Sequence, residues 1–142
     1  MKHAPRETSL RMRREVFGPD YVDRAALDRD AFNADLQDFI VDVNWAGVWS
    51  RDILSRRELM LVTLTLLATL GRMHEFETHF RNAVVRVGVP VDALRELLTH
   101  LTLYLGLPAA VDAFRVARRV LAEEGYDAET LARLLPADPA QG

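Results

Sequence analysis

The sequence predicts an all-α protein, and three observations lead to this prediction. Apolar residues recur at intervals of three and four along most of the chain, which is the spacing of one helix face. No alternating run flanks a hairpin turn, and no βαβ period is visible. The length of 142 residues fits one domain. We therefore expect a single domain over residues 1–142, with its core at about 11–123 and a tail over 126–142.

The N-terminal segment SLRMRREVFG predicts a short helix. Ser9 is suited to its N-cap, and Gly18 is suited to its end. The basic cluster at residues 11–15 is expected on a solvated helix face. Residues 20–30 are expected to form a connector.

The next segment predicts an amphipathic helix from Asp30 to about Val43 that packs on the core. Gly47 and Ser50, in NWAGVWSRD, predict a break behind it. The apolar residues at helical spacing are Phe32, Leu36, Phe39, Ile40 and Val43.

The middle of the chain predicts a helix buried on all sides. Ser55 and Glu58 form a capping box that opens it, and Gly71 is suited to its end. Residues 59–70 are apolar around the whole helix, and a chain of this size can barely cover them alone. This predicts a homo-oligomer. A membrane span needs about 20 apolar residues, so we expect no membrane association and a cytoplasmic location.

The following segment predicts a helix with a buried stripe that ends at Gly88. The stripe consists of Phe76, Phe80, Ala83, Val84 and Val87.

The C-terminal third predicts two long helices and a short one. Asp92 is expected to cap the first, and Pro108 to lie in the first turn of the second. Gly125 is expected to end that helix and Asp127 to cap the last one. The final residues, LLPADPAQG, are expected to fray.

Charge and cysteine content exclude several functions. The net charge of −3 argues against a nucleic-acid surface. The absence of cysteine excludes disulfides, thiolate metal sites and thiol redox chemistry.

The stretch GRMHEFETHF contains Glu75 and His79, four residues apart and therefore on one helix face. They are either a proton-handling pair or an ordinary surface pair worth a few tenths of a kcal/mol, and spacing alone favours the surface pair. His74 is expected to be exposed, and it lies five residues from His79, which does not favour a metal site. His100 is expected to be a core or interface histidine.

A long part of the chain, from about Arg11 to Glu123, resembles the carboxymuconolactone decarboxylase family. The matching pieces are Trp45, VWSR, SRRE, LATLGR, Glu75 with His79, GVPVDALRELL, YLGLPAA and AFRVA. The resemblance implies an all-α, alkylhydroperoxidase-like fold that forms homotrimers or homohexamers. Peroxidase relatives of this fold use a C-x-x-C pair, which this chain lacks, so the lactone decarboxylase branch remains.

The resemblance implies a cofactor-independent decarboxylase that needs no metal. Its anionic substrate would be γ-carboxymuconolactone or a similar unsaturated lactone acid, as in the protocatechuate branch of the β-ketoadipate pathway. His79 is our candidate proton donor, and Glu75 is expected to orient its ring and raise its pKa. Arg51 and Arg72 are candidates to hold a substrate carboxylate, with helix-end solvation as the alternative.

Trp45 and Trp49 are candidates to wall the pocket, with a core or interface role as the alternative.

Four positions depart from the family's pattern. Gly47 replaces a glutamate, Val85 and Arg86 replace two asparagines, and Val111 replaces another asparagine. These changes leave the fold prediction intact and open two alternatives to the substrate. One is an isomerase or cyclase on the same scaffold, and the other is a non-catalytic oligomeric binding protein.

Overall fold

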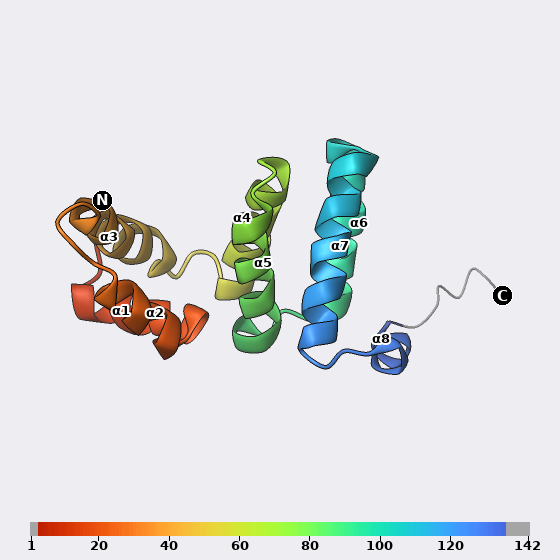
Figure 1. Cartoon of the computed structure of the whole chain (residues 1–142), viewed down its shortest axis with the longest axis horizontal. Coiled ribbons are helices and arrows are strands. Elements are labelled where there is room, and N and C mark those ends of the chain that lie inside the picture. The colour runs from red at the N-terminus through yellow and green to blue at the C-terminus, as the bar shows by residue number, and fades with distance from the viewer. Residues whose placement is uncertain (1–2, 136–142) are drawn as a thin grey trace. The chain divides into compact units, whose positions relative to one another are not determined.

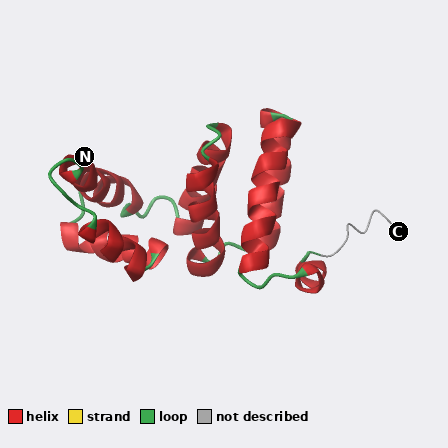
Figure 2. Cartoon of the chain, viewed as in Figure 1, coloured by secondary structure: helices red, strands yellow, loops and turns green. Residues whose placement is uncertain are grey.

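A computed structural model describes residues 3–135 of the chain. This part of the chain is built from helices and contains no strand (Figure 2), which confirms the all-α prediction. It forms two compact units, of which the first runs to Leu59 and the second begins at Met60. Each unit is described separately below, and the single domain over residues 1–142 stays a prediction.

The first unit begins with two helices, α1 (Arg6–Phe17) and α2 (Pro19–Leu27) (Figure 1). Gly18 separates them at φ +87°, a conformation that side chains with a Cβ rarely adopt, so the predicted end of the first helix is confirmed. The connector predicted at 20–30 is wrong, because Pro19 supplies the fixed φ that starts α2 directly after this glycine.

Ser9 is also not the N-cap. It lies buried inside α1, and its hydroxyl donates to the carbonyl oxygen of Pro5 at 3.2 Å. The helix starts earlier than predicted because Pro5 precedes its first turn.

The second half of this unit is α3 (Ala34–Phe39), which continues directly into the π-helix η1 (Ile40–Trp49). The helix ends at Trp49 with Ser50 as its C-cap, so the predicted break is confirmed at Ser50 and wrong at Gly47. The amide of Ser50 donates to Trp45 O at 3.0 Å, and its hydroxyl donates to Ala46 O at 2.6 Å. π-Helical turns are rare and often occur at functional sites.

Some apolar residues of the predicted amphipathic helix are exposed to solvent, so the prediction that they pack on the core is wrong. Phe32 is 99% exposed, and Leu36 and Phe39 are exposed as well. Buried residues of η1 lie instead on the side that packs on α1: Val41, Trp45, Ala46 and Trp49.

The helix α4 (Arg56–Thr69) begins as predicted. The amide of Ser55 donates to the Glu58 carboxylate at 2.6 Å, and the Glu58 amide donates to the Ser55 hydroxyl at 3.2 Å, which confirms the capping box. Gly71 follows the helix at φ +67°. The prediction of burial on all sides is wrong for the single chain. Met60, Leu64 and Ala68 are buried, whereas Val62, Leu66 and Leu70 are exposed.

In the second unit, α5 (Met73–Asn82) continues into the π-helix η2 (Ala83–Val87), and Gly88 ends it in the left-handed conformation. Phe76 and Phe80 are fully buried and stack with ring centroids 5.7 Å apart. Ala83 is buried too, so the centre of the predicted stripe is confirmed.

Three helices complete the described chain: α6 (Val91–Leu105), α7 (Leu107–Glu123) and α8 (Ala128–Leu134). Asp92 is not the cap of α6, because the helix begins at Val91 after Pro90. Pro108 does lie in the first turn of α7. Asp127 caps α8 by accepting from the Thr130 amide at 2.8 Å, as predicted.

Ion pairs tie α5 to α7. Arg81 pairs with both Glu123 and Glu124, and Arg119 pairs with Glu77 at 2.5 Å. The last residues of the tail expected to fray, 136–142, lie outside the described residues.

Candidate functional site

Two tryptophans of η1 form the aromatic core of the first unit. The rings of Trp45 and Trp49 lie 5.0 Å apart, and Trp45 meets Phe17 of α1 edge-on at 5.7 Å. Both indoles are nearly fully buried, at 3% and 6% exposure. The core role that the sequence left open is therefore what the single chain shows, and a pocket-wall role stays a prediction.

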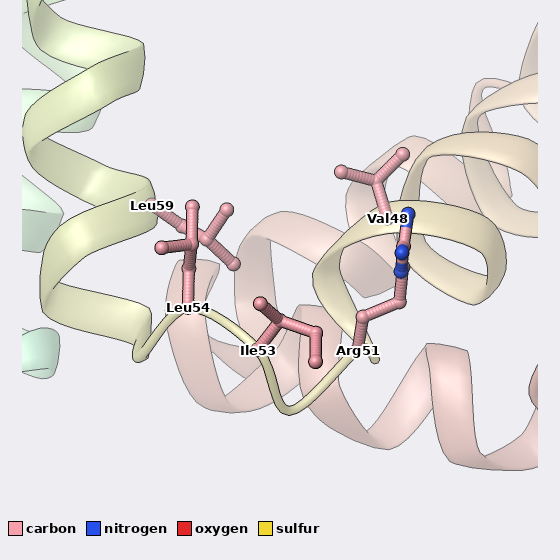
Figure 3. Close-up of a pocket in the computed structure, with 5 residues that line it drawn as sticks. All are labelled: Val48, Arg51, Ile53, Leu54 and Leu59. Carbon is pink, nitrogen blue, oxygen red and sulfur yellow. The ribbon is translucent and has the colours of Figure 1, made fainter.

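A pocket of about 180 Å³ follows the C-terminal end of η1. Val48 and Arg51 lie on one side of it, and Leu54 and Leu59 lie on the other, with Ile53 between them (Figure 3). The lining is aliphatic except for the Arg51 guanidinium. Pockets for drug-sized ligands hold about 300–1,000 Å³. The pocket is open to solvent, since Ile53 is 82% exposed, and its lining offers a small molecule apolar contacts and one positive charge.

The guanidinium groups of Arg51 and Arg72 form no ion pair within the described residues. Arg51 belongs to the pocket of the first unit, and Arg72 is the exposed residue that precedes α5 in the second unit. Both charges are therefore available for an anion. Arginine can bind a carboxylate through two parallel hydrogen bonds.

His79 lies on α5 between the buried Phe76 and Phe80, and its ring is half-buried. Its Nδ1 donates to the backbone carbonyl oxygen of Glu75 at 2.8 Å. A carbonyl can only accept, so this bond places the proton of the neutral ring on Nδ1. In the neutral ring Nε2 is then the nitrogen that carries no proton.

Burial lowers the pKa of His79 below its usual 6.5. The hydrogen bond to the Glu75 carbonyl and the charge of the Glu75 carboxylate both act in the opposite direction, and burial outweighs them. Glu75 therefore acts on the ring in the predicted direction, because it raises the pKa of His79, but burial has the larger effect and the net pKa is lowered. Glu75 orients the ring through its backbone, and its side chain is exposed.

The other histidines differ in their surroundings. His74 is exposed, as predicted. His100 is also exposed in the single chain and stacks on Tyr104 with ring centres 5.0 Å apart, so a core role is wrong. Within residues 3–135, no three His, Asp or Glu side chains gather closely enough to hold a metal ion.

The candidate residues fall into two groups. Trp45, Trp49 and Arg51 belong to the first unit, whereas Arg72, Glu75 and His79 lie together at α5 of the second. Sequence reasoning missed the aliphatic lining of the pocket, for which Val48, Ile53, Leu54 and Leu59 gave no signal beyond hydrophobicity.

It also missed Arg13. The cluster at residues 11–15 is solvated as predicted at most positions, but Arg13 is buried. Its spacing from Ser9 and Val16, four and three residues away, was a signal of a shared inner face.

The positions that depart from the family's pattern lie in different settings. Gly47 is buried in η1, one residue before Val48 of the pocket lining. Val85 and Arg86 are exposed on η2, and Val111 is exposed on α7. None of the helices in residues 3–135 combines the length and the hydrophobicity needed to span a membrane.

Comparison with known proteins gives concordant matches. The carboxymuconolactone decarboxylase family matches residues 34–119. A 4-carboxymuconolactone decarboxylase of Acinetobacter baylyi is 41% identical over 120 residues, which cover 84% of this chain and 89% of that protein. The nitrosuccinic acid decarboxylase npaB of Metarhizium robertsii is 29% identical over 115 residues, covering 81% and 80% of the two chains. The chain therefore belongs to the carboxymuconolactone decarboxylase family.

Proposed function

We propose that the protein is a cofactor-independent decarboxylase of a 4-carboxymuconolactone-like unsaturated lactone acid. The observation that carries this proposal is the 41% identity to a 4-carboxymuconolactone decarboxylase over most of both chains. The second relative is also named as a decarboxylase, although its substrate is a nitro acid. Loss of CO2 is the reaction that the two relatives' names have in common.

The reaction needs no external electron acceptor, because the substrate contains one. The bond between the γ-carbon and its carboxylate breaks, and the electron pair moves through the ring double bond to the lactone carbonyl oxygen. A dienolate results, and protonation of a ring carbon then gives the product lactone. The protein must stabilise the negative oxygen and supply one proton.

His79 is the proposed proton donor. Its Nδ1 bond to the Glu75 carbonyl fixes the ring on α5, so that Nε2 can carry the transferred proton. Burial lowers the pKa of the ring and favours its neutral form, whereas the negative charges of a bound dianionic substrate favour the protonated form. Glu75 is a positioning residue in this scheme, because its backbone holds the ring and its charge supports protonation.

The pocket in the first unit has an aliphatic part and a positively charged part, and a dicarboxylate substrate needs both. Arg51 is suited to the carboxylate that remains in the product, because a charge-assisted pair anchors it. The departing carboxylate is better held by the aliphatic side chains, since an ion pair would stabilise it before it leaves. Arg72, which precedes α5 in the second unit, is a second candidate anion holder, and Trp45 and Trp49 remain candidate pocket walls.

The protein is further proposed to act as a homotrimer or homohexamer. Val62, Leu66 and Leu70 lie on one exposed face of α4, where a second copy can cover them. Light scattering at micromolar concentration should give a multiple of the 16.1 kDa chain mass. A mass of one chain would reject this assembly.

The second candidate function is decarboxylation of a different acid by the same chemistry. Gly47, Val85, Arg86 and Val111 replace polar residues of the family's pattern, and the relative that acts on nitrosuccinic acid is named for a substrate other than a lactone. A nitro group, like a lactone carbonyl, offers an oxygen that accepts the electron pair.

The proposal is tested by incubating the purified protein with 4-carboxymuconolactone and following CO2 release, with nitrosuccinate assayed in parallel. Turnover of either acid without added cofactor supports a decarboxylase, and the ratio of kcat/KM values assigns the substrate. Arg51→Met should raise KM by about 10- to 150-fold, since a hydrogen bond to a charged group contributes about 1.5–3 kcal/mol. Arg57→Met is the matched control, because Arg57 is exposed on the adjacent α4 and does not line the pocket. No CO2 from either acid would reject the proposal.

A further inference from the structure

The turn that precedes α3 holds an aromatic side chain out into solvent. Phe32 is almost wholly exposed, yet its backbone is fixed, because its amide donates to the Asp30 carboxylate at 2.8 Å. The Asn33 amide donates to the same carboxylate at 3.1 Å, and the Asn33 side-chain amide donates to Asp28 O at 2.8 Å. A hydrogen-bonded turn therefore presents the ring in a defined place, which lowers the entropy lost when a partner covers it.

Phe32 opens an apolar surface that continues along α3. Leu36 and Phe39, four and seven residues later, lie on the same helix face and are exposed; we call these three residues the α3 stripe. The carboxylates of Asp28, at the end of α2, and Asp35, next to Leu36, form no ion pair in the described chain. An apolar centre that contains aromatic rings and has its charges at the rim is typical of a protein–protein interface.

The second unit contains a surface of matching character on α4. Val62, Leu66 and Leu70 follow one another at intervals of four residues and are exposed; we call them the α4 ridge. Arg72 lies just beyond its end, and the Arg72 guanidinium forms no ion pair in the described chain. The α4 ridge is therefore apolar with a positive end, whereas the α3 stripe is apolar with a negative end.

Another exposed apolar surface of the second unit fits the α3 stripe less well. It lies at the corner between α6 and α7 and contains Leu103, Tyr104 and Leu107. The charged side chains that follow on α7, Asp112 and Arg115, pair with each other at 2.7 Å. This corner therefore offers no free arginine at its edge, whereas the α4 ridge does.

We propose that the α3 stripe of one copy packs on the α4 ridge of a second copy of this chain. The inference rests on the homo-oligomer proposed above and names the two surfaces that form it. The two rows have similar lengths, since seven residues of helix span about 10.5 Å and eight span about 12 Å. With the helices antiparallel, Leu66 lies against Leu36 of the partner subunit. The Arg72 guanidinium then meets Asp35 of the partner subunit.

This contact has a consequence for the assembly and another for the site. It joins two different surfaces of the chain, and contacts of this kind can close into a ring, such as the proposed homotrimer, whereas a surface that pairs with itself closes a dimer. A guanidinium that is neutralised by a carboxylate has little charge left for a substrate. In the assembly Arg51 of the pocket is therefore the anion holder, and Arg72 is an interface residue.

The apolar contact is tested with Leu70→Glu, and Leu107→Glu is the matched control, because both leucines are 69% exposed in the single chain. Sedimentation across a dilution series gives the association constant. Loss of an anchoring interface side chain weakens association by about 30-fold or more. We expect this effect in Leu70→Glu and not in Leu107→Glu. Equal effects of the two substitutions would overturn the inference, because they would show that any exposed leucine contributes to association.

The charged contact is tested by exchanging its signs. Arg72→Glu places two carboxylates opposite each other and should weaken association by about tenfold. Adding Asp35→Arg to the same chain restores opposite charges and should recover most of this loss. Absence of any recovery would overturn the antiparallel arrangement.

A cross-link identifies the two surfaces directly, because the chain contains no cysteine of its own. Leu36→Cys and Leu66→Cys chains that carry tags of different length are co-expressed and treated with a short bismaleimide. We expect a cross-linked product that contains one chain of each kind, and no product from either variant expressed alone.

The remaining outcomes separate this inference from the homo-oligomer itself. Cross-linking of Leu66→Cys alone would show that α4 packs on α4 of the partner, which would overturn the inference. A mass of several chains without the mixed product would also overturn it and would leave the homo-oligomer in place. A mass of one chain would reject the homo-oligomer as well, and would assign the α3 stripe to a partner other than this chain.

Discussion

The pH dependence of the reaction gives the sharpest test of His79. If the protonated ring delivers the proton, kcat/KM follows the protonated fraction of His79 in the free enzyme. A histidine with the ordinary pKa of 6.5 is about one-quarter protonated at pH 7. Burial lowers the pKa of His79, so its protonated fraction at pH 7 is smaller still. The resting enzyme is therefore mostly in the inactive form at neutral pH.

This predicts that kcat/KM falls by close to tenfold between pH 7 and pH 8. The substrate carboxylates, with ordinary pKa values near 4, do not titrate in this range. In the substrate complex, two nearby negative charges favour the protonated ring, so the fall in kcat should begin at a higher pH than the fall in kcat/KM. Loss of a positioned acid costs about 10²–10⁴-fold, and His79→Gln should lose that much kcat and the pH dependence together.

The assay is the initial rate of CO2 release from pH 6 to pH 8.5 at constant ionic strength. His74→Gln is the control, because this exposed histidine lies on the same helix. A flat kcat/KM profile in the wild type would refute the reasoning. An unchanged slope in His79→Gln would assign the titration to another group.

Four further outcomes are expected. Glu75→Gln removes a charge that raises the pKa of His79. The kcat/KM profile of the variant should therefore shift to lower pH, with a modest loss of rate. An unshifted profile would contradict an interaction between the Glu75 carboxylate and His79. His79 binds its proton near pH 6.5 in the unfolded chain and only at lower pH in the folded protein, so the free energy of unfolding should decrease as the pH falls below 6.5. The decrease should be smaller in His79→Gln. Urea titrations at pH 7.5 and 5.5 measure it, and a larger decrease in the variant would refute the reasoning. Phe76→Ala removes a fully buried ring and should cost about 3–5 kcal/mol in the same titrations, where a cost below 1 kcal/mol would contradict the packing. Gly47→Glu places a carboxylate at a buried position of η1 and should lower the melting temperature. The decrease should be largest at high pH, where the carboxylate is charged. A melting temperature equal to that of the wild type at every pH would show that the position is open to solvent.

Local signals predicted several helix ends, although Ser9 and Asp92 were not the caps that we expected. Ser55 with Glu58, Asp127, and the glycines at 18 and 88 each act through their own backbone and the next few residues, so the sequence contains the whole interaction. Pro19 is a local signal of the same kind, because it starts α2. We did not predict this helix start, since the residues that follow it were expected to form a connector.

Exposure could not be predicted in the same way. The stripe with Phe32 and the outer face of α4 are as apolar as true core segments, and hydrophobicity alone does not tell which neighbour covers them. The π-helix η1 was missed because its changed hydrogen bonding leaves no local sequence signal such as a proline or a turn motif.

For the candidate site, the resemblance located His79 and Glu75, but the sign of the pKa change required the burial of the ring. Arg13 shows the opposite case. A charged residue within a basic cluster is expected in solvent, and only the packing of α1 on η1 revealed that it is buried.

The placement of the tryptophans has a consequence for folding studies. Trp45 and Trp49 are the chain's only two, and both belong to the unit that ends at Leu59, whereas helices that contribute to circular dichroism occur in both units. Coincident thermal curves by the two methods would indicate a single cooperative transition. A destabilising change in the other unit, such as Phe76→Ala, would then shift both curves. If the halves melt independently, the same change would alter the ellipticity and leave the emission untouched.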